Sequence, residues 1–81
     1  MSRERYETEW EGLRLVVEGC PDHWQAFVYD PAACEVLYTA ERMNIVSAKH
    51  AAIAFAAAMH FGPAHDLKSE VIADMLVWEP V

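Results

Sequence analysis

Cys20 and His23 are the residues of this sequence that come nearest to a nucleophile beside a base. A reactive cysteine needs a neighbouring group that stabilises its thiolate, and a histidine three residues along the chain is a weak signal of one. The second cysteine, Cys34, forms no Cys-x-x-Cys pair of the kind that binds zinc. A turn in so small a chain offers little to exclude water. We therefore interpret both cysteines as structural and predict no catalytic residues and no enzymatic activity.

A second group of chemically active side chains, His60, His65 and Asp66, flanks a Gly-Pro dipeptide at residues 62–63. Imidazole and carboxylate groups are zinc ligands, and this is the metal-like cluster that the spacing of the histidines allows. The structural interpretation is a helix that ends in a histidine and a second helix that Asp66 caps. We favour that interpretation and predict no metal and no cofactor. A metal or small-ligand site at this break remains the alternative function.

The charge balance excludes several classes of partner. The chain has 13 Asp and Glu against 6 Lys and Arg, a net charge of −7 and an isoelectric point near 4.8. Binding to nucleic acids and to anionic membranes depends on Lys and Arg, so we predict neither as a partner. The longest apolar run, residues 51–59, is about half of the roughly 20 residues that a membrane helix needs. The charged first residues resemble no secretory signal, so for a native start we expect a cytoplasmic protein with reduced cysteines.

Alternating apolar and polar residues predict strands in the first half of the chain. Residues 6–10 and residues 13–17 each alternate, but with opposite parity. A bulge or kink at Gly12 would bring the apolar residues of both segments onto one face of one strand. Residues 23–29 and 35–39 are predicted as the second and third strands of an antiparallel meander. Cys20 and Cys34 then lie about 23 Å apart at opposite ends of the second strand, beyond the reach of a disulfide.

Alanine dominates the second half, with seven alanines in residues 48–58. This composition predicts a long helix from Asn44 or Ser47 to Phe61, ended by the Gly-Pro pair. The residues predicted to face the sheet are Ile45, Ala48, Ala52, Phe55, Ala56 and Met59. A second helix is predicted from Asp66, with one apolar stripe of Leu67, Val71, Met75 and Trp78. Residues 75–79 remain open between the end of this helix and a short fourth strand.

Together these elements predict an α+β fold: a three-stranded antiparallel meander followed by two helices (β-β-β-α-α), in a single domain over residues 1–81. The order of elements over residues 13–61 resembles the small modules of HicB-like antitoxins and, more loosely, double-stranded RNA-binding domains. The turn at residues 30–34 is not the Pro-Gly-rich loop of the first family, and no DNA-binding helix pair is appended. Lys49 is the one certain cation of the long helix, so the second resemblance lacks its basic surface. The resemblances therefore imply no function and no site residues.

Two surface patterns indicate a binding role. The second and third predicted strands are apolar on both faces, whereas a three-stranded sheet with one helix layer buries one face. Ser47, Ala51, Ala54 and Ala58 form a small-residue strip that allows close approach of another helix, although exposed alanine is also simply a good helix former. We therefore predict a small acidic cytosolic interaction domain that forms a homodimer, or binds a protein partner, through the sheet face or the Ala-rich helix. The candidate interface residues are Trp10, Trp24, Phe27, Tyr29, Tyr38, Trp78, Ala51, Ala54 and Ala58.

Overall fold

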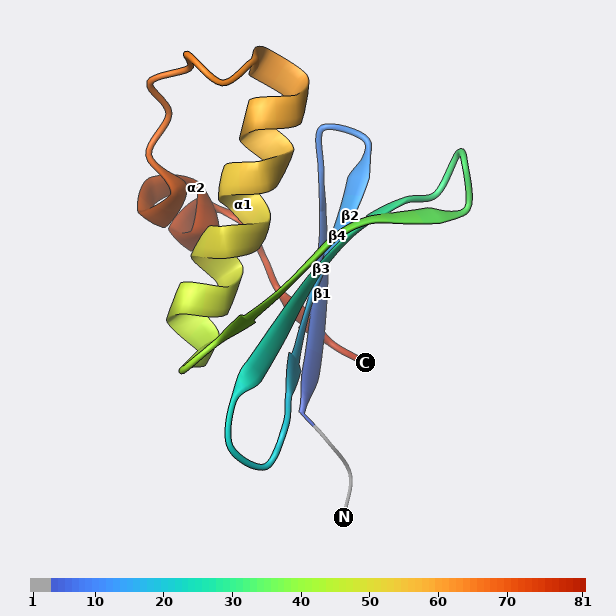
Figure 1. Ribbon diagram of the computed structural model, residues 1–81, viewed down its shortest axis with the longest axis vertical. Helices are drawn as coiled ribbons and strands as arrows, with labels where there is room; N and C mark the ends of the chain where they lie inside the picture. Colours follow the sequence, from blue (N-terminus) through green and yellow to red (C-terminus); the bar gives the residue numbers. More distant parts are fainter. Residues whose placement is uncertain (1–3) are drawn as a thin grey trace.

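A computed structural model describes residues 4–81, and in it four strands precede two helices and a short final strand (Figure 1). The elements are β1 Arg5–Trp10, β2 Leu13–Gly19, β3 Trp24–Asp30, β4 Glu35–Arg42, α1 Ile45–Phe61, α2 Ser69–Met75 and β5 Glu79–Pro80. The strands form one antiparallel sheet in the order β4-β3-β2-β1-β5. The chain is α+β, but the predicted three-stranded meander is wrong, because the sheet has five strands.

The first strand beyond the three predicted arises because a tight turn at residues 11–12 separates β1 from β2. Glu11 and Gly12 have φ angles of 53° and 78°, and positive φ at both central residues is characteristic of a type I′ hairpin turn. Trp10 pairs with Leu13 across this turn, so the chain reverses where a bulge was predicted. The two apolar sets do share one face, as their alternation requires. They reach it on neighbouring strands, and the predicted bulge in one strand at Gly12 is wrong.

Replacement of Gly12 tests this turn. Nothing lies within 4 Å of a Cβ built at Gly12, so the cost of Gly12→Ala comes from the backbone conformation alone. A positive φ costs an L-residue about 1–2 kcal/mol, and we expect Gly12→Ala to lower the free energy of unfolding by about that amount in urea titrations. Gly12→Asn is the matched control, because asparagine tolerates this region better, and it should cost less. Equal losses for the two variants would contradict the assignment.

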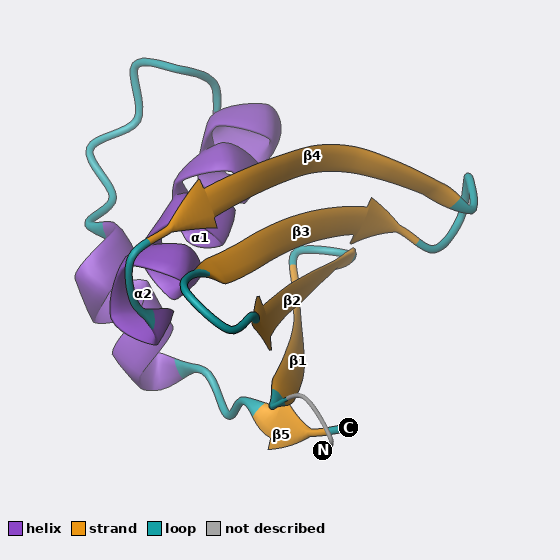
Figure 2. Cartoon of the chain, turned by 60° about the horizontal axis from the view of Figure 1, so that its bottom comes forward, coloured by secondary structure: helices purple, strands orange, loops and turns teal. Residues whose placement is uncertain are grey.

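The second additional strand is β5, at residues 79–80. It overlaps the segment 75–79, for which helix and strand both remained open. β5 pairs with the outer edge of β1 through Tyr6 and Pro80 and through Glu7 and Glu79 (Figure 2). A proline suits this edge position, since its missing N–H removes no bond from the interior of the sheet. Residues 79–80 are therefore strand, and α2 ends at Met75.

The second helix is shorter than predicted and is rotated relative to the predicted stripe. Its N-cap is Lys68, and Asp66 lies before the helix and does not cap it. Leu67, Val71 and Met75 are 39%, 52% and 71% exposed. The buried residues of α2 are Ile72 and Ala73, which belong to the core cluster that includes alanines of α1. Of the predicted stripe, Trp78 alone packs on the core, and its Nε1–H donates to the Ala73 carbonyl at 3.2 Å.

Both helices cover the same face of the sheet (Figure 2). α1 packs across β2, β3 and β4, and α2 packs against α1. The boundaries of α1 follow the local signals: the Asn44 side chain accepts the Ser47 N–H at 2.9 Å, and Gly62, at φ 91°, ends the helix. Met59, predicted to face the sheet, is half exposed, whereas Ile53 is fully buried and was not predicted to be. The alanines against the sheet allow the α1 backbone to lie close to it.

Candidate functional site

The turn between β2 and β3 holds Cys20 and His23, but it directs the imidazole to carboxylates. His23 Nδ1 lies 2.6 Å from Asp22 Oδ1, and His23 Nε2 lies 3.8 Å from Glu41 Oε1. The hydrogen bond from His23 lowers the pKa of the Asp22 carboxyl below its usual value. Cys20 meets His23 through its backbone, donating its N–H to the His23 carbonyl at 2.8 Å. Cys34 lies beyond the other end of β3, and neither cysteine forms a disulfide.

The residues around the Gly-Pro break do not assemble into a site. His60 Nε2 lies 3.0 Å from Glu11 Oε2 in the β1–β2 turn. His65 Nδ1 instead accepts the backbone N–H of Leu67 at 3.1 Å. Across residues 4–81, no three His, Cys, Asp or Glu side chains are grouped closely enough to hold a metal ion. His60 therefore joins the end of α1 to the hairpin turn.

Four of the six aromatic interface candidates serve the core on the helix side. These four are Trp10, Trp24, Tyr38 and Trp78. Tyr38 stacks on Phe55 with ring centroids 4.4 Å apart, and Lys49 Nζ lies 5.2 Å from the centre of the Trp78 ring. Their aromatic surface is thus largely used inside the fold.

The three alanine candidates lie differently on α1. Ala51 is buried in the core cluster, Ala58 is half-buried and Ala54 is exposed. The small-residue strip is therefore only partly available to another chain. Of the nine candidates, Phe27 and Tyr29 remain as large side chains on the face of the sheet away from the helices.

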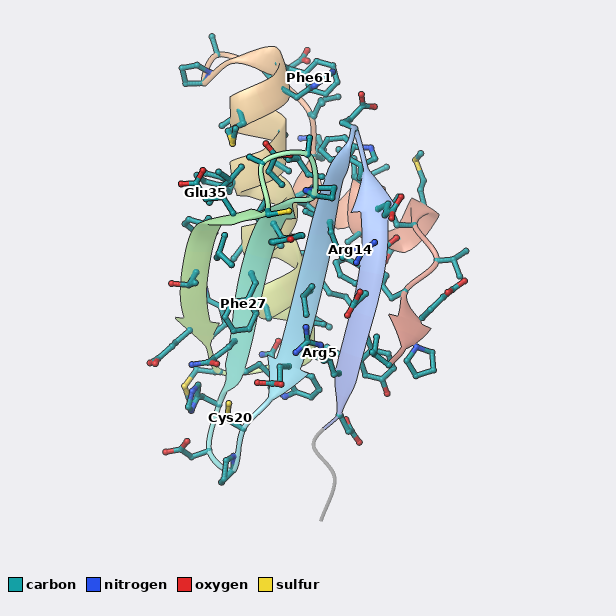
Figure 3. The ribbon with its side chains drawn as sticks, turned by 90° about the vertical axis from the view of Figure 1, so that its right-hand side faces the viewer. Arg5, Arg14, Cys20, Phe27, Glu35 and Phe61 are labelled. Atoms are coloured by element: carbon teal, nitrogen blue, oxygen red, sulfur yellow. The ribbon has the colours of Figure 1, made fainter. Side chains whose placement is uncertain are left out.

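We call this surface the open face. In β2 and β3, residues Leu15, Val17, Ala26 and Val28 point into the core, so the residues between them point to the opposite side. Figure 3 looks onto this side, with α1 behind the sheet and with Arg5, Arg14 and Phe27 labelled on it. The open face comprises Arg5, Glu7, Glu9, Arg14, Val16, Glu18, Gln25, Phe27, Tyr29, Val36, Thr39 and Glu41.

The strand register arranges these side chains in three rows that run across β1, β2, β3 and β4. The first row is Arg5, Glu18, Gln25 and Glu41. The middle row is Glu7, Val16, Phe27 and Thr39. The third row is Glu9, Arg14, Tyr29 and Val36. The apolar and aromatic groups thus lie together over β2, β3 and β4, and the charged groups lie on the β1 side and along the first row.

A network of ion pairs occupies the β1 side of the open face. Arg5 Nε lies 3.4 Å from Glu7, and Arg5 Nη1 lies 3.5 Å from Glu18. Arg14 lies 3.0 Å from Glu9 and 3.7 Å from Glu7. The hydrogen bond to Glu9 raises the pKa of the Arg14 guanidinium, which keeps it charged at any physiological pH. The two arginines are thereby held against the sheet.

The apolar part of the open face is slightly hollow. A depression of about 460 Å³ is lined by Arg5, Glu7, Arg14, Val16, Phe27, Tyr29 and Val36. Val16 forms its floor at 4% exposure, whereas Val36 is half exposed. A hydrogen bond with Cys34 is the largest cause that raises the pKa of the Tyr29 phenol, and burial raises it further. This side chain therefore stays neutral. The depression therefore combines an apolar floor with fixed charges of both signs.

Sequence reasoning found Phe27 and Tyr29 but missed Arg5, Arg14, Val16 and Val36. One signal was present: Val16 is apolar at a position between Leu15 and Val17, where strict alternation requires a polar residue. An apolar residue on both faces of a strand indicates that both faces take part in packing. The arginines carried no signal, because their position depends on the β1–β2 hairpin.

Comparisons of the chain with protein-family models, with curated proteins and with solved structures find no match. In the part of the chain that the structure describes, no helix is both long and apolar enough to cross a membrane.

Proposed function

We propose that this protein is a small cytoplasmic interaction domain that self-associates, and that the open face binds the same face of a second copy. The observation that carries the proposal is the cluster of Val16, Phe27, Tyr29 and Val36 on the side of the sheet away from both helices. An antiparallel sheet tolerates a solvated face, but such a face is ordinarily polar. Aromatic residues and arginine are the residues enriched at protein interfaces.

Charge favours a second copy as the occupant. The open face carries two guanidinium groups beside four carboxylates, so the same face of a second copy offers an arginine a carboxylate partner across the interface. Two chains of net charge −7 repel one another, but at physiological ionic strength this repulsion is screened within about 8 Å. The alanine strip on α1 is the weaker candidate, because Ala51 already belongs to the core of its own chain.

The test is the oligomeric state of the purified chain by sedimentation equilibrium at tens of micromolar. We expect a dimer whose Kd rises at least about tenfold in Phe27→Glu, since a buried charge at the centre of the interface costs more than 1.4 kcal/mol. Val46→Glu is the matched control: it introduces the same charge at an exposed apolar site on α1 and should leave the dimer intact. A wild-type chain that stays strictly monomeric, or equal weakening by both variants, would overturn the proposal.

A further inference from the structure

We infer that the two copies are related by a two-fold axis that runs along the strands, between β2 and β3, and that Arg5 recognises the partner's Glu41. This inference rests on the proposed function. An axis in this position turns each row of the open face onto itself and exchanges β2 with β3 and β1 with β4. The register of the three rows then fixes which side chains meet.

Three of the six resulting contacts are complementary, and the other three place Glu7, Glu9 and Glu18 on the partner's Thr39, the partner's Val36 and the partner's Gln25. In the middle row, Phe27 lies on the partner's Val16. In the third row, Tyr29 lies on the partner's Arg14, whose planar guanidinium can stack on an aromatic ring. In the first row, Arg5 faces the partner's Glu41. Each contact occurs twice because the interface is symmetric.

Three other positions of the axis bring like charges together. An axis along β2 places Arg14 on the partner's Arg14, and an axis along β3 places Glu18 on the partner's Glu41. An axis across the strands, through the middle row, places Glu7 on the partner's Glu7. Two like charges in direct contact across an interface repel each other at the effective dielectric constant of a protein surface. The position between β2 and β3 avoids all three contacts.

Arg5 can make this contact and keep its ion pairs within its own chain. Arg5 holds Glu7 through Nε and Glu18 through Nη1. A guanidinium has five N–H donors, so donors remain for a third carboxylate. Glu41 is exposed, and its Oε1 lies 3.8 Å from the imidazole Nε2 of His23. The contact therefore pairs a preorganised guanidinium with an accessible carboxylate.

A charge-exchange experiment tests the axis. Arg5→Glu alone and Glu41→Arg alone each place like charges at both symmetric contacts, and we expect either substitution to weaken the homodimer at least tenfold. Mixing the two variants restores opposite charges at both contacts, so we expect a 1:1 heterodimer of near wild-type affinity in native mass spectrometry. Because any repulsion within each chain persists in the mixture, this rescue cannot come from folding.

Two further variants are controls for net charge. Lys68→Glu and Glu70→Arg make the same changes of charge on exposed residues in and beside α2, and their mixture should show no preference for the heterodimer. The outcomes separate the two proposals. A wild-type monomer overturns the proposed function and the axis with it. A wild-type dimer whose Arg5→Glu and Glu41→Arg variants form no preferred heterodimer overturns the axis alone.

Discussion

Leu15→Ala should lower the free energy of unfolding by about 3 kcal/mol, within the range of 2–5 kcal/mol that buried leucines show. Leu15 is fully buried on β2, between Thr8 of β1 and Val28 of β3, in the core cluster under α1. Truncation removes three carbons from the centre of the core. The sheet cannot move in to fill the space, because β2 is paired on both sides.

The measurement is urea denaturation monitored by circular dichroism. An unchanged m-value would show that the shift in midpoint reports stability. For a domain of this size a loss of 1 kcal/mol lowers Tm by about 4–8 °C, so the effect should be large in thermal melts as well. Leu67→Ala is the control, since Leu67 lies in the connection between α1 and α2 and is partly exposed. A loss for Leu15→Ala that is no larger than that for Leu67→Ala would contradict the assignment of the core.

Ala56→Leu should also destabilise the fold, by about 1–3 kcal/mol, although leucine is the more hydrophobic residue. Ala56 is fully buried where α1 lies against the sheet, so three added carbons must push the helix away or take strained rotamers. The same substitution at exposed Ala54, two residues earlier in α1, is the control. Alanine and leucine differ little in helix propensity, so Ala54→Leu should change stability by less than about 0.5 kcal/mol.

The comparison is again made by urea denaturation. A neutral or stabilising Ala56→Leu would show that α1 does not pack closely on the sheet. The two variants separate the limit on side-chain size where α1 contacts the sheet from the helix propensities of alanine and leucine. It also tests why the helix is so rich in alanine.

The elements that local chemistry determines were predictable from the sequence. α1 begins after Asn44 and ends at Gly62 because a side-chain cap and a residue at positive φ act within one turn of the helix. The alternation of β3 is equally local: Ala26 and Val28 lie on one face and Phe27 lies on the other. Such features need no information from distant parts of the chain.

The elements that depend on tertiary contacts were not predictable. A change of parity between residues 6–10 and 13–17 fits either a bulge or a two-residue turn, and glutamate is an unusual first residue for a type I′ turn. Helical spacing alone favoured Leu67, Val71 and Met75 as the buried stripe of α2, but docking on α1 selected Ile72 and Ala73. The two residues of β5 are too few for any periodic signal.

The candidate site was predictable in part for the same reason. Phe27 and Tyr29 follow from the alternation of one strand, so they were found. Which face the helices would cover depends on packing between elements, and four aromatic residues were therefore assigned to a surface that the fold uses internally. Arg5 and Arg14 reach the open face only because β1 and β2 form a hairpin.

The pairing of β5 with β1 has a consequence for the order in which the chain folds. This contact joins Tyr6 to Pro80 and the Val81 N–H to the Arg5 carbonyl, so it closes almost the whole chain into a loop. The entropic cost of closure grows with the length of the loop, whereas a strand of two residues recovers few hydrogen bonds. The hairpins of β1–β4 span short loops and can form before it. We therefore expect the final strand to be the last to form and the first to fray, and the open face is complete without it.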